Sequence, residues 1–249
     1  MASRKVIRYL PRDFEIEESL RDQLSSRAGA QRFLQGATEA LLIVHEVPEP
    51  KVPEREALVF WMQADGTWRS PGGSEGLKEM SRLLDRYQAV IDDHEAQIDE
   101  TEEVTRVFEI IRHAGPIARS TRNLQTTLEA AVSADEDNRT LIGLRDRARE
   151  IQRAAELLYH DAKLTLDFWQ AESAEEHQQA AERLNAIAFR LNLMAGFFLP
   201  LVAVAGLLGM NVEIPGFLQP WFWGILSIGL VLGLIVLFLV GWEGVRRKR

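Results

Sequence analysis

The residues of this chain whose types and spacing could do chemistry lie in one helical stretch near its C-terminal end. Eight small, apolar or amide-bearing residues recur there at alternating steps of three and four positions: Asn185, Ala188, Asn192, Ala195, Leu199, Val202, Gly206 and Gly209. This heptad spacing places them on one helix face and is typical of helices packed in a left-handed bundle. Small side chains let helices approach closely, and an asparagine in a membrane requires a polar partner or water. Several copies around a symmetry axis would satisfy both needs and enclose a pore, whereas a plain helix dimer would also explain the spacing.

Two long uncharged segments predict that the chain crosses a membrane twice. Residues 191–210 and 221–242 are twenty and twenty-two positions long, and each would measure about 30 Å or slightly more as a helix. The connector 211–220 contains no Lys or Arg, whereas the tail 243–249 ends in Arg-Arg-Lys-Arg. The positive-inside rule therefore predicts a protein of the inner (plasma) membrane with both termini in the cytoplasm and the tail at the lipid headgroups.

The charge and the cysteine content of the chain argue against several functions. The 249 residues carry a formal net charge of −8, and since residues 191–249 contribute +2, residues 1–190 carry −10. Nucleic-acid binders rely on cationic contacts to phosphate, so we expect no nucleic-acid partner. The chain has no cysteine and therefore no disulfide, thiolate zinc site or cysteine nucleophile. Because we find no phosphate loop, nucleophile–base set or paired catalytic carboxylates, we expect neither an enzyme nor a resident cofactor.

Residues 1–73 are expected to form a small cytoplasmic α/β domain. β-Branched and aromatic residues predict strands over 40–47 and 56–63. Asp-Gly after the second strand suggests a tight turn to a short strand at Trp68. The domain leaves room for one or two helices, which we place within 15–35.

Residues 74–190 are expected to form a helical cytoplasmic funnel and stalk. Apolar residues at helical spacing predict a first helix that continues to about residue 113, where Gly115-Pro116 should break it. A second helix over 117–132 and a polar turn lead to a third helix, which runs from about residue 139 into the first span. The predicted fold class is a mainly α membrane protein with two C-terminal transmembrane helices, a long stalk helix continuous with the first, and a small N-terminal α/β part.

The end of the first span resembles the CorA family of divalent-cation transporters, which includes the zinc-transporting ZntB branch. The resemblance rests on Gly209-Met210-Asn211 between two C-terminal spans and on the run Phe198-Leu199-Pro200-Leu201 before it. It is strengthened by Glu213 and by the basic tail, and it covers about residues 180–249. It implies a homopentameric funnel in which the first span of each subunit lines a central pore and the second span packs outside.

The resemblance implies that Asn211, with Gly209 and Met210, forms the selective outer mouth of the pore. Mg²⁺ sheds water reluctantly, and five amide carbonyls can hydrogen-bond the hydrated ion without stripping it. Carboxylates at that position would hold the ion more tightly, while conduction needs release. Glu213 would raise the cation concentration at the mouth through its field.

The resemblance also assigns roles deeper in the pore. Asn185 matches a pore-lining asparagine near the cytoplasmic end, and Leu191 and Leu199 match apolar positions that close the pore by dewetting. Two positions depart from the family pattern: Val202 stands where a threonine is frequent, and Ala188 stands where a methionine-type constriction lies.

The ion is chosen from ligand chemistry, and three functions remain open at this point. Zinc favours nitrogen and sulfur ligands, yet the last histidine is His177 and the pore offers only oxygen. We therefore favour Mg²⁺, with Co²⁺ or Ni²⁺ passing as similar hydrated ions. The alternatives are a ZntB-like Zn²⁺ transporter and a CorA-like membrane effector that conducts poorly or only when triggered.

Acidic and histidine residues of the predicted cytoplasmic part are further candidates for metal ligands. Asp92, Glu95 and Asp99 are spaced i, i+3 and i+7, so they share one helix face and could hold a regulatory cation. The alternative is a solvated helix face. The five histidines show no ligand spacing and are expected on the surface or the stalk: His45, His94, His113, His160 and His177.

Overall fold

The computed structural model describes residues 7–50, 52, 54–73, 75–209, 221, 223–224, 227–231, 233–235 and 238. The chain divides into two compact units, Met1–Gln170 and Ala171–Arg249. One helix of 71 residues, α4 (Arg139–Gly209), contributes to both units. The expectation of a mainly helical chain with a small N-terminal sheet and one long helix is confirmed.

The N-terminal sheet is an antiparallel meander in the order β1-β2-β3-β4. Its strands are β1 (Arg32–Gln35), β2 (Ala40–His45), β3 (Ala57–Met62) and β4 (Trp68–Arg69). The three strands expected from β-branched and aromatic residues are therefore confirmed as β2, β3 and β4. Gly66 in the turn before β4 has φ +82°, a left-handed conformation that glycine adopts without strain.

The helix expected within 15–35 is wrong over most of that range. Only α1 (Glu18–Asp22) is helical, and the end of the range is the strand β1. Gly29, at φ +67°, redirects the chain between them. β1 pairs along its whole length with β2, for example Phe33 with Leu42. This hairpin pairing with the next strand outweighs the local helix signal.

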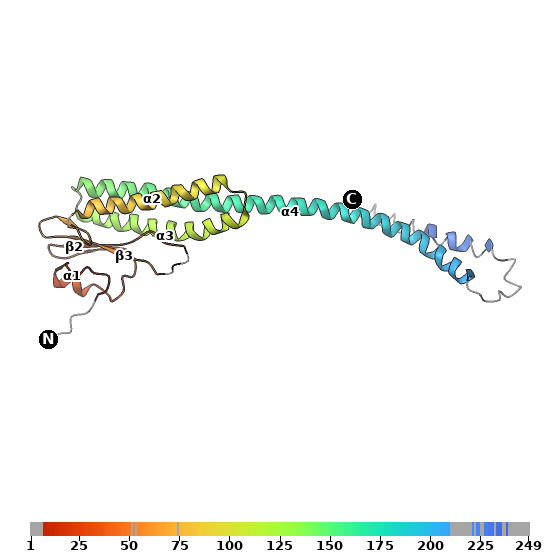
Figure 1. Ribbon diagram of the computed structural model, residues 1–249, viewed down its shortest axis with the longest axis horizontal. Coiled ribbons are helices and arrows are strands. Elements are labelled where there is room, and N and C mark those ends of the chain that lie inside the picture. Colours follow the sequence, from red (N-terminus) through yellow and green to blue (C-terminus); the bar gives the residue numbers. More distant parts are fainter. Residues whose placement is uncertain are drawn as a thin grey trace. The chain divides into compact units, whose positions relative to one another are not determined.

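Alternate residues of β2 face two different apolar clusters, as the period of two in a strand requires. Leu42 and Val44 join the cluster that includes the long helices, while Leu41 and Ile43 join the cluster that includes α1. All six residues of β2 are buried. Figure 1 shows the sheet between the helical bundle and α1.

Three antiparallel helices form the bundle of the first unit (Figure 1): α2 (Gly76–Glu100), α3 (Val104–Ala134) and the first part of α4. The apolar positions that predicted α2 are buried at Met80, Leu83, Leu84, Tyr87 and Ile91, and Leu77 is half-buried. The α4 residues that fill the same core are Leu141, Leu144, Ala148, Ile151, Ala155, Leu158 and Ala162.

The break between α2 and α3 lies at residues 101–103, so the predicted break at Gly115-Pro116 is wrong. Pro116 lies inside α3. It removes one backbone hydrogen bond, but Ala114 and Ile117 on either side are fully buried, and their packing keeps the helix continuous. The acidic run at 99–103 explains the observed position, since carboxylates oppose the dipole at the C-terminus of α2 and favour the N-terminus of α3.

The second unit contains the rest of α4 and the described part of the second predicted span. α4 continues through Pro200 to Gly209, as the stalk hypothesis required. Within the described residues, α4 is the one helix long and apolar enough to cross a membrane. Residues 227–231 and 233–235 are helical, and the other positions described in 221–242 are too few to test the whole span.

Candidate functional site

The heptad face of α4 is uncovered in the single chain. All eight of its residues, from Asn185 to Gly209, are exposed. Leu199 and Val202 each show 66% of their surface, which is unusual for large apolar side chains and requires a covering partner or lipid. Leu191, expected as an apolar pore position, is 56% exposed. We refer to the eight heptad residues as the seam.

A different face of α4 is covered by the second span. Leu193, Gly196, Phe197 and Pro200 are partly buried. A Cβ added to Gly233 would lie 3.1 Å from the carbonyl oxygen of Phe197 and 3.5 Å from its ring. At 100° per residue Phe197 lies roughly opposite the seam. Among the described residues, Gly233 of the second span therefore packs against α4 on a face away from the seam.

The seam offers two side-chain amides to a cation pathway. The side chains of Asn185 and Asn192 are exposed and make no hydrogen bond to any described residue. In a membrane such amides need water or a polar partner from another chain. At the other end of the seam, Gly206 and Gly209 have no side chain and let helices approach closely.

Part of the predicted mouth falls beyond the described residues. Gly209 is the last described residue of α4, and Met210, Asn211 and Glu213 lie outside the described part of the chain. Their roles stay predictions from the sequence motif. The geometry adds that the motif directly follows an uninterrupted helix.

The acidic residues expected to hold a regulatory cation lie on the outer side of α2. Asp92, Glu95 and Asp99 are exposed, and α4 adds Asp161 to their surroundings, which the sequence reading missed. Burial raises the pKa of Glu95, and repulsion from Asp92, Asp161 and Asp99 raises it further. Within the residues the structure describes, no three His, Cys, Asp or Glu side chains are arranged to hold a metal. The regulatory site therefore stays a prediction that requires ligands from another chain.

The expectation that all five histidines lie on the surface or the stalk is wrong for three of them. His45 and His113 are buried, and the ring nitrogens of His94 and His113 lie 2.6 Å apart. His160 and His177 are exposed on α4, as expected. The error follows from the misplaced helix break, because a reversal at 101–103 brings residues on either side of it together.

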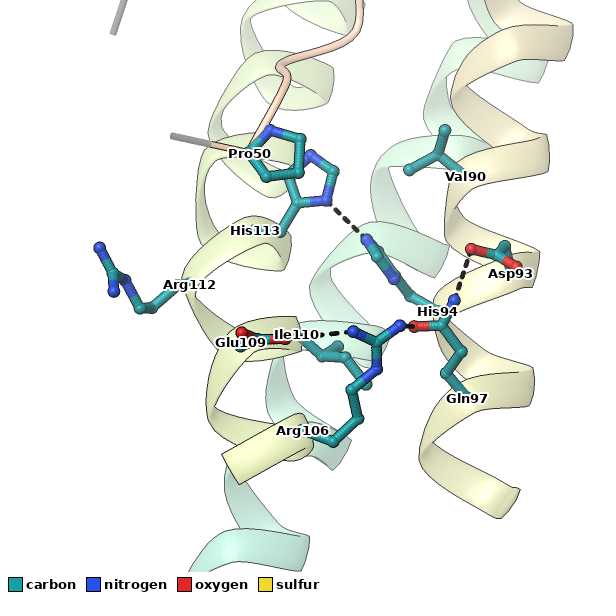
Figure 2. A pocket seen from close by; sticks show the side chains of 10 residues that line it. All are labelled: Pro50, Val90, Asp93, His94, Gln97, Arg106, Glu109, Ile110, Arg112 and His113. Atoms are coloured by element: carbon teal, nitrogen blue, oxygen red, sulfur yellow. Dashed lines mark hydrogen bonds and ion pairs between the residues drawn. The ribbon is translucent and has the colours of Figure 1, made fainter. Parts of the chain in front are cut away.

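Figure 2 shows the two rings meeting from neighbouring helices beside a cavity of about 570 Å³. Nε2 of His113 lies 2.5 Å from the carbonyl oxygen of Pro48. Burial lowers the pKa of His94, and the neighbouring His113 lowers it further. Both effects favour the neutral form of the His94 ring. A break placed correctly at residues 101–103 would have revealed the pair from sequence, because the two positions are nearly symmetric about it.

One solved structure supports the fold, and two others match with lower TM-scores. A structure of the full-length CmaX protein matches 96% of this chain and 84% of its own, with a TM-score of 0.61 and 21% identity. The CorA magnesium transporter from Methanocaldococcus jannaschii matches 84% of this chain and 78% of its own, with a TM-score of 0.44 and 12% identity. The ZntB cytoplasmic domain from Vibrio parahaemolyticus matches 65% of this chain and 80% of its own, with a TM-score of 0.44 and 14% identity.

Comparison with families extends beyond the motif that suggested the resemblance. No curated protein matches the chain closely. The family model described as CorA-like Mg²⁺ transporter protein matches residues 74–248, which include the helical bundle, the seam and both predicted spans. The chain therefore belongs to the CorA-like family of divalent-cation transporters, a family of membrane proteins.

Proposed function

We propose that the protein is a homopentameric channel for hydrated divalent cations, with the seam of α4 lining its central pore. The observation that carries this proposal is the two-sided character of α4. One face receives the second span at Gly233, and the roughly opposite face exposes eight residues at heptad spacing. Copies arranged around an axis would cover the seam and surround its asparagines with water, whereas one chain leaves them unpartnered.

A second exposed stripe, on the cytoplasmic part of α4, supports assembly with other copies. Leu157, Leu164 and Phe168 are 59%, 52% and 65% exposed, and their spacing of seven and four places them on one helix face. Neighbouring subunits of the same chain would bury this stripe. The partners implied are therefore identical subunits, the surrounding lipid and the transported ion.

Mg²⁺ is the proposed ion, and Co²⁺ and Ni²⁺ are expected to pass in the same hydrated form. The polar side chains along the seam are amides, whose oxygens suit a hard cation that keeps its water. An inside-negative potential favours entry by about 2.3 kcal/mol per charge per 100 mV, and by about twice that for a divalent ion. The channel therefore needs no energy source besides the gradient.

The decisive experiment is Mg²⁺ uptake into proteoliposomes by wild type and by Asn211→Ala. Loss of the carboxamide ring should abolish uptake, because nothing else at the mouth replaces its contacts to the hydrated ion. The matched control is Asn123→Ala, which removes an exposed asparagine on α3 far along the sequence from the spans and should leave uptake unchanged. Normal uptake by an intact Asn211→Ala oligomer would refute the assigned role.

The same liposomes separate the other functions. Zn²⁺ uptake that depends on a pH gradient, without Mg²⁺ uptake, would identify a ZntB-like transporter. A protein that shows no flux of any divalent ion until a ligand or partner is added would be an effector. The absence of a polar side chain at Val202 favours this alternative. Steady Mg²⁺ current blocked by a hexaammine mimic of the hydrated ion would support the channel.

A further inference from the structure

The pair His94–His113 brings together two nitrogen ligands for metals that the proposed channel does not use. His94 comes from α2 and His113 from α3, and the two rings point toward one another across the hairpin (Figure 2). His113 is 9% exposed and His94 is half-buried at the wall of the cavity. Both histidines are therefore held in place while one side of the pair remains accessible.

The hydrogen bonds assign the protons on both rings. The carbonyl of Pro48 can only accept, so Nε2 of His113 carries a hydrogen and donates it. In the neutral tautomer with this hydrogen on Nε2, the lone pair of His113 lies on Nδ1, where it can accept the N–H of His94 Nε2. One proton thus lies between two nitrogens that are both good ligands for transition metals. A carbonyl behind a ligating histidine is also the usual support that fixes its tautomer.

We propose that His94 Nε2 and His113 Nδ1 bind a transition-metal dication such as Zn²⁺, Co²⁺ or Ni²⁺, which takes the place of the shared proton. That proton moves to Nδ1 of His94, so both imidazoles stay neutral and no proton is lost. Nδ1 is buried and makes no hydrogen bond within the described residues, so the position is free to receive it. The resulting buried donor carries a cost that the metal–nitrogen bonds offset.

The geometry requires only a small movement. Metal–nitrogen bonds of about 2.0–2.1 Å at tetrahedral or octahedral angles need the two nitrogens roughly 2.9–3.4 Å apart. They are now 2.6 Å apart, and the ring planes meet at 81°. His94 faces a cavity of about 570 Å³, which allows its ring to shift and leaves room for water ligands.

The chemistry of the site separates it from Mg²⁺. Imidazole nitrogen suits Zn²⁺, Co²⁺ and Ni²⁺, while Mg²⁺ prefers oxygen. The charged groups around the cavity balance: Asp93 and Glu109 are acidic, and Arg106 and Arg112 are basic. Affinity would therefore come from the two nitrogens and not from a negative field. The site lies in the cytoplasmic bundle and stands whether or not the seam conducts.

The test is Co²⁺ binding by the full-length protein in detergent, without a histidine tag and in excess Mg²⁺ to occupy oxygen-ligand sites. Nitrogen ligands shift the visible d–d absorption of Co²⁺ and strengthen it relative to the hydrated ion, so wild type should show this changed spectrum for one ion per chain. His94→Gln and His113→Gln should lose the signal. His160→Gln, which removes an exposed histidine of the same unit, should keep it, as should Asn211→Ala.

The outcomes separate this inference from the channel. Wild type that shows no nitrogen-type Co²⁺ spectrum, or a spectrum retained by both histidine variants, overturns the site. His94→Gln keeps the bond between His113 and Pro48, so it decides the matter if His113→Gln does not fold by circular dichroism. Loss of Mg²⁺ uptake in Asn211→Ala with an unchanged Co²⁺ spectrum would leave both proposals standing independently.

Discussion

The two parts of α4 repeat residues at the same helical spacing, but only one of the two resulting faces is covered by its own chain. In the first unit, the residues from Leu141 to Ala162 that recur at helical spacing are buried by α2 and α3 of their own chain. In the second unit, the seam recurs at the same spacing and is fully exposed. Periodicity alone therefore predicts that a helix face is covered, but it does not identify the chain that covers it. The partner must be deduced from what the rest of the molecule leaves open.

The composition of the two faces differs in a way that indicates the partner. The buried face contains Leu and Ile with alanine at the close contacts, which suits a dry core. The seam contains two glycines, two alanines and two asparagines beside Leu199 and Val202, which suits close helix approach with water or polar groups nearby. Asparagine in a dry core would be left unsatisfied, whereas beside a wet axis it is solvated. This contrast is what favours a shared pore over a further layer of core.

The largest effect is expected from adjacent leucines at the end of the buried part. Leu158 is 1% exposed and its neighbour Leu157 is 59% exposed. Leu158→Ala should lower the free energy of unfolding by about 2–5 kcal/mol, because it removes buried methyl groups and leaves a cavity. Leu157→Ala should change it by no more than about 0.5 kcal/mol. Urea unfolding of the full chain, followed by circular dichroism, measures both.

The same pair also tests the assignment of partners. Leu157→Ala should reduce the oligomeric fraction on dilution, as measured by native mass spectrometry, although it hardly affects the fold. Equal losses of folding stability in the two variants would mean that the stripe at Leu157 is buried within one chain. The proposal that other subunits cover this stripe would then be wrong.

An intermediate effect is expected from two glycines of the second unit. A Cβ at Gly233 would lie 3.1 Å from the carbonyl of Phe197, whereas a Cβ at Gly206 meets nothing within 4 Å among the described atoms of the chain. Overpacking costs about 1–3 kcal/mol. Gly233→Val should therefore destabilise the second unit in every chain, including dissociated monomers. Gly206→Val should affect only the assembled protein.

Native mass spectrometry and Mg²⁺ uptake distinguish an effect on the fold of one chain from an effect on the assembled protein. Gly206→Val is expected to leave monomer helicity unchanged and to lower the oligomeric fraction or the uptake. Normal assembly and normal uptake in Gly206→Val would show that the seam faces lipid and would remove the basis for a pore.

Much of this molecule follows from its sequence because its signals are local and strongly periodic. The strands β2 and β3, the start of α4 and its continuation through Pro200 were all expected within a few residues. Proline at position 200 did not end the helix, and neither did Pro116. In both cases one missing hydrogen bond is outweighed by the helix on either side.

The failures concern residues whose structure depends on a partner in another element. β1 forms because β2, the next strand, offers it a pairing partner, and a helix assigned to the same residues hid that hairpin. The His94–His113 contact depends on the position of a three-residue reversal, and an error of about a dozen residues in that position hid it. Asp161 approaches Glu95 only through the packing of α4 near α2. The candidate mouth rests on sequence alone, because Asn211 lies outside the described residues.

The smallest effect is expected at the acidic edge of the covered part of α4, where Glu95 lies near Asp161. Burial and the neighbouring carboxylates raise the pKa of Glu95 above its value in the unfolded chain, about 4.3. The folded state therefore binds more protons in the window just above that value, and stability falls as pH rises through it. At pH values above the folded pKa, the loss of folding stability caused by ionised Glu95 is constant. At pH values below the unfolded pKa, this loss disappears because the carboxyl is protonated in both states.

Glu95→Gln removes the cost of ionising this carboxyl in the folded state, so it should raise the Tm slightly at neutral pH. At about pH 4 its Tm should change no more than that of the control variant. The control is Glu100→Gln, an exposed residue of the same helix. Mg²⁺ should raise the Tm of wild type more than that of Glu95→Gln, since a cation near the cluster offsets the same repulsion. A lower Tm for Glu95→Gln at neutral pH would mean that the carboxylate already has a stabilising partner. The covered part of α4 would then carry no electrostatic strain for a regulatory ion to relieve.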